Sequence, residues 1–272
     1  QKMAVSKLEE IGLDDATIEI SGSVSSQRSS KLKPILRIDG NSMVKGGEKE
    51  SGGSMTIRGS LKIVNTVEEF KTIDKVKLLN AEGKKLWDDI RTGRAEKDTS
   101  RLVPFLLLTF ADLKKHVFLY WFAFPSVAPN MSRTFKIPLS SSSSSIQTFE
   151  CPESLTTQLK KIGSPFAFVV RRKDFTVHPI ESINKMEEEK VEYLVGCQDL
   201  SANETHPGWI VRNLLVMLSV RYKLTRASVL CYRAHSKSLL FPDIIIPSAS
   251  DMSSSSLSSS SQDEPVRVVG WE

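Results

Sequence analysis

Residues 206–233 read HPGWIVRNLLVMLSVRYKLTRASVLCYR, and this stretch determines the fold. Thr205 fits the N-cap of a helix. Pro207 fits the first turn, where the missing backbone N–H of proline removes no hydrogen bond of the helix. An apolar run at Val229–Tyr232 follows the helix as a short strand. The stretch therefore predicts a helix that docks on a sheet. Five apolar side chains recur at helical spacing and define its buried face: Val211, Leu214, Leu215, Leu218 and Tyr222.

Two further helices are predicted upstream of this stretch. Thr66 and Glu69 have the spacing of a capping box, which indicates a short first helix. A second helix runs from about Lys75 to Arg91, and Gly93 is placed to end it. Gly83 lies inside that helix and weakens it by about 0.8–1 kcal/mol relative to alanine, a choice that a close packing contact would explain. The predicted apolar face comprises Val76, Leu79, Leu86, Trp87 and Ile90.

A hairpin is predicted between these helices and the opening stretch. The apolar runs Val103–Phe110 and Val117–Phe124 flank a polar connection at residues 111–115. Their composition favours strands at the centre of a sheet with both faces covered, and Pro125 and Pro129 are expected to end the second strand. If one face of the hairpin is exposed instead, it forms an apolar patch suited to binding. The aromatic residues concerned are Tyr120, Trp121, Phe122 and Phe124.

The remaining short apolar runs complete the prediction of the fold class. Together with the helices they predict an α+β fold with mixed, largely antiparallel sheets, packed helices and two subdomains. The runs that read as strands are Thr17–Ile20, Leu61–Val64, Phe166–Val170, Tyr193–Gly196 and Val266–Glu272.

Composition divides the chain into four parts. Residues 1–60 are expected to hold a partial N-terminal segment, with a short helix and a turn at Gly12–Asp15, and then a disordered linker rich in Ser, Gly, Lys and Arg. Residues 61–247 form the predicted core, interrupted by a serine-rich loop near residues 140–145. Residues 248–265 read as a serine-rich, low-complexity linker. Residues 266–272 are expected to begin a truncated continuation.

The overall composition excludes several classes of function. Thirty-seven basic and thirty-two acidic side chains give a net charge of +5, too weak and dispersed to predict nucleic-acid binding. No apolar run is long enough to span a bilayer, so no membrane insertion is expected. The three cysteines have neither disulfide nor zinc-site spacing, which indicates a reducing compartment. With Gln1 at its start, the chain is expected to be a fragment of a cytoplasmic protein.

No catalytic constellation is evident in the residues. The sequence contains no dinucleotide-binding fingerprint, no P-loop and no nucleophile elbow. Its four histidines have neither metal-ligand spacing nor a carboxylate partner visible in the sequence. Cys197 and Cys231 read as buried small hydrophobic residues rather than nucleophiles. We therefore expect no catalytic, cofactor-binding or metal-binding residues in this chain.

Several segments nevertheless resemble one known family. The run FADLKKHVFLYWFAFP (Phe110–Pro125) and the run PGWIVRNLL (Pro207–Leu215) are similar to the N-terminal domain of autophagy-related protein 7, the ubiquitin-like modifier-activating enzyme of autophagy. Further similar pieces occur in the family's order, and the resemblance covers roughly two thirds of the chain. These pieces are Lys7–Asp15, Val64–Lys75, Ala81–Ile90 and Gly270–Glu272.

The resemblance implies a division of labour within a longer enzyme. That enzyme adenylates autophagy-related proteins 8 and 12 and carries them as a cysteine thioester, while its N-terminal domain recruits the conjugating enzymes, autophagy-related proteins 3 and 10. The catalytic cysteine, the ATP and zinc sites and the dimer interface belong to a C-terminal domain that this chain lacks. The chain alone is thus expected to be non-catalytic, and the resemblance implies a cytoplasmic location that includes the pre-autophagosomal structure.

Four residues are candidates for contact with a partner: Trp209, Arg212, Asn213 and Trp121. A structural role is favoured for the first three, with Trp209 packed beneath its own helix. Two interpretations of the whole chain also remain. In the first, it is the recruiting domain of the complete activating enzyme. In the second, it is a free-standing interaction module that has lost the adenylation domain.

Overall fold

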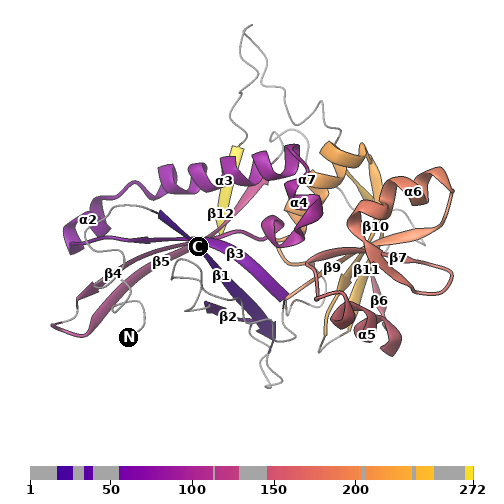
Figure 1. The fold of residues 1–272 in the computed structure, drawn as a ribbon, viewed down its shortest axis with the longest axis horizontal. Coiled ribbons are helices and arrows are strands. Elements are labelled where there is room, and N and C mark those ends of the chain that lie inside the picture. Colours follow the sequence, from indigo (N-terminus) through magenta and orange to yellow (C-terminus); the bar gives the residue numbers. More distant parts are fainter. Residues whose placement is uncertain are drawn as a thin grey trace, which may run out of the picture.

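Two mixed sheets and the helices around them make up the described part of this computed structural model (Figure 1). Each sheet has six strands, of which one neighbouring pair is parallel and the others are antiparallel. The predicted α+β class with mixed, largely antiparallel sheets is confirmed. The structure describes residues 17–26, 34–38, 55–112, 114–128, 146–201, 203, 206–234, 237–247 and 267–271.

The first sheet has the strand order β12-β5-β4-β3-β1-β2. Its parallel pair is β3–β4, and the helices between these two strands make the crossover that a parallel connection requires. Its strands are β1 (Thr17–Ser26), β2 (Pro34–Ile38), β3 (Met55–Ile63), β4 (Phe105–Asp112), β5 (Val117–Ala128) and β12 (Arg267–Trp271). The crossover contains α2 (Val67–Thr72), α3 (Lys75–Arg91), α4 (Arg94–Lys97) and the 3-10 helix η3 (Thr99–Leu102).

The prediction of a disordered linker within residues 21–60 is wrong where the structure describes that segment. β1 extends to Ser26, β2 follows, and β3 starts at Met55 rather than at Leu61. Small residues obscured the pattern, because β1 carries buried Ile20 and Val24 among serines and a glycine. The predicted helix and turn in residues 3–15 lie outside the described residues, as do the serine tracts, and the division into four parts stays a prediction.

The helices of the crossover form largely as their local signals predict. Thr66 caps α2 by accepting a bond from the Glu69 amide at 3.0 Å, and α3 has the predicted bounds. A side chain at Gly83 would place its Cβ 2.2 Å from a methyl of Val268 in β12, which identifies the close contact expected there. Val76 is the exception on the predicted apolar face, since 66% of it is exposed.

The second sheet has the strand order β6-β11-β10-β9-β7-β8. Its parallel pair is β9–β10, and helix α7 connects these strands. The predicted strands at Phe166–Val170 and Tyr193–Gly196 are confirmed within one or two residues. The elements are β6 (Gln147–Phe149), α5 (Glu153–Lys161), β7 (Ala167–Arg171), β8 (Val177–Pro179), η4 (Ile180–Ser182), α6 (Ile183–Glu188), β9 (Tyr193–Gln198), α7 (Val211–Tyr222), β10 (Arg226–Tyr232) and β11 (Ser238–Ile245).

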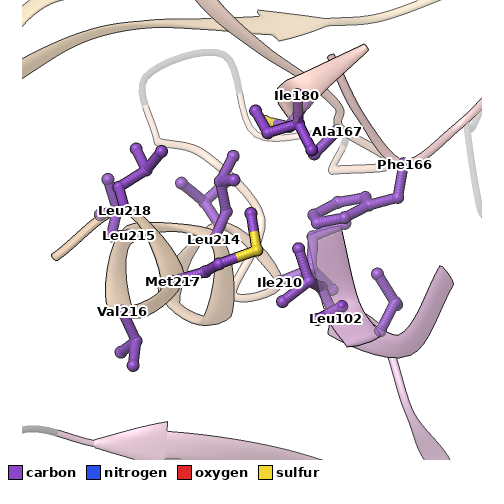
Figure 2. Close-up of a cluster of buried hydrophobic side chains, with 14 of the residues drawn as sticks. Leu102, Phe166, Ala167, Ile180, Ile210, Leu214, Leu215, Val216, Met217 and Leu218 are labelled. Atoms are coloured by element: carbon purple, nitrogen blue, oxygen red, sulfur yellow. The ribbon is translucent and has the colours of Figure 1, made fainter. Parts of the chain in front are cut away.

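Helix α7 lies between the two sheets and is buried on nearly all sides (Figure 2). Met217 extends toward Phe166, while Val216 points in another direction. The prediction of a single apolar face is therefore too narrow, because polar Asn213 and Ser219 are also fully buried. The helix begins at Val211 rather than near Pro207, so the predicted first turn is wrong; Thr205 lies outside the described residues.

Candidate protein-interaction surface

The β4–β5 hairpin exposes large apolar side chains near its tip. It extends on the side of the first sheet away from the second sheet (Figure 1). The exposed fractions are 46% for Val117, 44% for Phe118 and 74% for Tyr120. The expectation that both faces of this strand are covered is thus wrong for the first half of β5. The alternative, an exposed apolar patch, is the arrangement that the structure has.

A row of aromatic rings continues from the exposed part of β5 into the core. Phe122 stacks on buried Phe105 with ring centroids 5.8 Å apart, and Phe124 lies edge-on to Phe122 at 4.7 Å. Side chains alternate between the faces of a strand, so Phe118 and Tyr120 lie on the same face as this row. Trp209 ends the row, with its ring centroid 4.7 Å from that of Phe124, which places it against β5.

A buried ion pair positions the loop that carries Trp209. Arg233 bonds Asp199 at 2.7 Å, and their side chains are only 4% and 0% exposed. Arg233 also donates to the carbonyl oxygens of Asn203 and His206, whereas Asp199 accepts from the amide of Gly208 at 3.0 Å. A Cβ at Gly208 would lie 2.6 Å from that carboxylate, which explains the glycine before the tryptophan.

Asn213 is buried and has a structural role, because its side chain bonds the backbone of neighbouring segments. Its side-chain oxygen accepts bonds from the amide of Val127 at 3.1 Å and from the hydroxyl of Ser126 at 2.9 Å. Its side-chain nitrogen donates to the carbonyls of Leu102 at 2.8 Å and Pro125 at 3.4 Å. Fully buried and engaged in all of these bonds, Asn213 is out of a partner's reach in this fold. Arg212, the neighbouring candidate, is exposed.

The bonds of Asn213 also explain why Pro125 does not end β5. The last β4–β5 pair is Leu106 with Ala123, and β5 continues alone on that side to Ala128. The β4–β5 ladder has already ended at this point, so the missing N–H of Pro125 costs it no hydrogen bond. The asparagine side chain replaces the missing strand there, and the expected strand end at Pro125 is wrong for that reason.

Trp121 lies on the opposite face of β5 from the aromatic row. It is half-buried, and within the described chain its indole N–H has no hydrogen-bond partner. The four candidate residues are therefore not brought together: Trp209 joins the row, Arg212 is at the surface, Asn213 is internal and Trp121 faces the other way. Phe118 was not among the residues predicted for the exposed alternative, although the basic residues beside it indicate a surface position.

The tip of the hairpin carries two lysines, and the ammonium group of Lys115 lies 3.9 Å from the carboxylate of Asp112. Asp112 accepts bonds from the amides of Lys114 and Lys115 at 3.1 Å, which fixes the turn. Both lysines and His116 are exposed, and His116 has a φ of 53°, in the left-handed region. The surface thus combines apolar side chains with positive charge, a combination suited to an apolar partner segment that carries carboxylates.

The described part of the chain contains no cluster of three or more side chains that could together hold a metal ion. The sulfur atoms of Cys197 and Cys231 are 3.9 Å apart and buried. The Cys231 thiol and burial raise the pKa of Cys197 far above its usual range, which disfavours a nucleophilic thiolate. Among the helices that the structure describes, none has the length and apolar character to cross a membrane.

Comparison with solved structures relates this fold to a known domain. The crystal structure of Kluyveromyces marxianus Atg7NTD matches all of this chain and 89% of its own, with a TM-score of 0.70 and 20% identity. The crystal structure of the K. marxianus Atg7NTD-Atg10 complex matches with a TM-score of 0.66 and 19% identity, over the whole chain and 85% of that one. At these identities the matches establish the fold.

Sequence comparison relates the chain to curated proteins. The ubiquitin-like modifier-activating enzyme atg7 of Dictyostelium discoideum is 31% identical over 304 residues, which cover 98% of this chain and 40% of the relative. The chain thus spans about two fifths of that protein's length. The Gallus gallus enzyme ATG7 is 31% identical over 170 residues, 59% of this chain and 24% of its own. The model of the family described as "Ubiquitin-like modifier-activating enzyme ATG7 N-terminus" matches residues 1–272, and the chain therefore belongs to that family.

Proposed function

We propose that this chain is the docking domain that recruits the conjugating enzymes of autophagy to an ATG7-type activating enzyme. The partners in this proposal are autophagy-related proteins 3 and 10. Family membership supports the role, and the solved complex of a domain with the same fold, Atg7NTD-Atg10, supports the partner class. The observation that carries the proposal is the exposed apolar surface on β5, where Phe118 and Tyr120 lie beside two lysines.

The remaining steps of conjugation are assigned to the rest of the enzyme. In this proposal the activating cysteine, ATP, zinc and the homodimer interface belong to the C-terminal domain. Autophagy-related proteins 8 and 12 pass from that cysteine to the recruited conjugating enzyme. The 272-residue chain contributes binding rather than chemistry, and it acts in the cytoplasm, including the pre-autophagosomal structure.

Calorimetry with the purified chain tests the proposal. Autophagy-related protein 10 from the same organism is titrated into the chain without ATP, and autophagy-related protein 3 is titrated in parallel. We expect a saturable heat with either enzyme, because docking requires neither nucleotide nor thioester. Absence of binding to a chain with native circular dichroism would refute the docking role.

Matched substitutions test whether the β5 surface carries the binding. Phe118→Ser and Tyr120→Ser remove exposed aromatic side chains, so each should weaken binding about tenfold or more if these are hot spots. Val76→Ser is the control, since it removes an apolar side chain that is 66% exposed but lies on α3. Equal affinities for all three variants and the wild type would mean that the partner binds elsewhere.

A further inference from the structure

One edge of β5 has no neighbour along its first half. β4 pairs with Val117–Ala123 on one side, whereas β12 on the other side pairs only with Phe124–Ala128. The outer edge at Val117–Ala123 is therefore open within the described part of the chain. This open edge adjoins the end of β12. A further strand there would pair with β5 and lie end to end with β12.

The backbone polar groups of this open edge can be assigned by alternation. Asn213 bonds the amide of Val127 and the carbonyl of Pro125, and β12 occupies the other side of β5 at these residues. The backbone groups of odd-numbered residues thus point away from β12. Because successive residues of a strand point their N–H and C=O groups to opposite edges, those of Phe118, Tyr120 and Phe122 point outward. These backbone N–H and C=O groups are available to form hydrogen bonds with a further strand.

The open edge also lacks the usual protection against pairing. Natural edge strands are short, or carry charges, prolines or bulges. β6 and β8, the edges of the second sheet, have three residues each, and β2, the far edge of the first, contains a proline and an arginine. Val117–Ala123, by contrast, reads VFLYWFA, with neither charge nor proline.

We propose that the open edge of β5 receives a strand from a partner protein. The partner segment is extended, has apolar side chains at alternate positions, and carries carboxylates at the end that reaches the hairpin tip. The main chain of the partner segment forms hydrogen bonds with the outward backbone N–H and C=O groups of Phe118, Tyr120 and Phe122. These bonds supply affinity that does not depend on the side chains of the segment. The carboxylates face the exposed Lys114 and Lys115. This mode of binding does not require the partner to be a conjugating enzyme.

Defined peptides test the strand addition. The probes are fluorescein-labelled peptides of about ten residues in which valine and threonine alternate, with two glutamates at the N-terminal or the C-terminal end, so that both strand directions are sampled. Fluorescence anisotropy measures their binding to the 272-residue chain. Tyr120→Pro removes one outward N–H and leaves the β4 ladder intact, whereas Tyr120→Thr keeps the N–H and a β-forming side chain. We expect about tenfold weaker binding for the proline variant than for the threonine variant.

Two controls keep the result independent of the fold of the variants. Circular dichroism must show native structure for each, and peptides N-methylated at alternate valines repeat the test with the unaltered chain. N-methylation should abolish binding. Replacing both lysines by glutamate should weaken peptide binding. With this variant, peptides that carry additional glutamates should bind more weakly still. These outcomes together support strand addition at this edge.

Other outcomes would overturn the proposal. If no peptide binds, or if Tyr120→Pro and Tyr120→Thr bind equally, the edge accepts no strand. A wild-type dimer that Tyr120→Pro dissociates in sedimentation would show that a second copy occupies the edge. A chain extended past Glu272 with a relative's sequence that binds no peptide would show that the edge is covered within the same polypeptide.

Discussion

Substitution of Asn213 by alanine should destabilise the protein strongly, although the residue lies in no catalytic or binding site. The side chain bonds the amide of Val127 at 3.1 Å and the carbonyl of Leu102 at 2.8 Å, and it is fully buried. Each buried polar group left without a partner costs about 1–3 kcal/mol. Two such groups predict a loss of about 2–6 kcal/mol in the free energy of unfolding. For a chain of this size the melting temperature falls by about 2–4 °C per kcal/mol.

Urea denaturation followed by tryptophan fluorescence and circular dichroism measures this loss. Arg212→Ala is the matched control, because the neighbouring arginine is exposed on the same helix and should change stability by less than about 0.5 kcal/mol. If the two variants are equally stable, Asn213 does not hold β5 and η3 to α7. In that event the assignment of its hydrogen bonds is incorrect.

Asn213→Asp extends this test to pH. The ionised carboxylate can still accept from Val127 but would face the carbonyl of Leu102, whereas the protonated acid can donate to it. Burial and these carbonyls should raise the folded-state pKa of the aspartic acid above its unfolded value of about 3.9. The variant's deficit relative to wild type should then be small near pH 4 and should grow as pH rises through the raised pKa. A deficit that does not vary with pH would contradict this reasoning.

Three further predictions address other parts of the molecule. Gly83→Ala should destabilise the protein despite alanine's better helix propensity, because its Cβ would meet Val268 at 2.2 Å; adding Val268→Ala should restore part of the loss in urea denaturation. Arg233→Met should lower the free energy of unfolding by about 3–5 kcal/mol, because Asp199 is left as an unpaired buried charge. A thiol reagent at pH 7–8 should label two of the three cysteines only after unfolding in urea, since they are buried and the pKa of one is raised; these two are Cys197 and Cys231.

Each of these predictions has a result that contradicts it. A more stable Gly83→Ala variant would mean that β12 does not pack on α3 at this point. An Arg233→Met loss below about 1 kcal/mol would place the ion pair at the surface rather than in the core. Rapid labelling of all three cysteines in the native protein would show that β9 and β10 open readily, and mass spectrometry of the labelled protein identifies the sites.

The elements with local signals were predictable from the sequence. Helices α2 and α3 could be predicted from the cap at Thr66, the apolar pattern of Lys75–Arg91 and the glycine at position 93. Caps and helix-ending glycines act within a few residues of the helix end. The β4–β5 hairpin follows from two apolar runs around a short polar connection. Family segments then indicated the class of protein. These signals do not depend on distant parts of the chain.

Long-range arrangement could not be predicted in the same way. No residue in β1 or β12 specifies which strand it joins, and the serine and glycine content of β1 concealed it. The helical pattern of α7 gave one buried face because the second sheet on its other side is not encoded locally. The predicted apolar face of five residues does not include buried Asn213 for that reason. The exposure of Tyr120 likewise depends on which distant elements pack on its face of β5, which sequence periodicity does not report.

The position of β12 has a consequence for synthesis of the protein on the ribosome. This strand completes the first sheet at Phe124–Ala128, yet it leaves the ribosome only after every strand of the second sheet. Roughly 140 residues separate the two partners, which corresponds to about 7–28 s at translation rates of about 5–20 residues per second. During this interval the outer side of β5 is uncovered along its whole length. A chaperone that binds extended apolar segments would have its best opportunity on the nascent chain then.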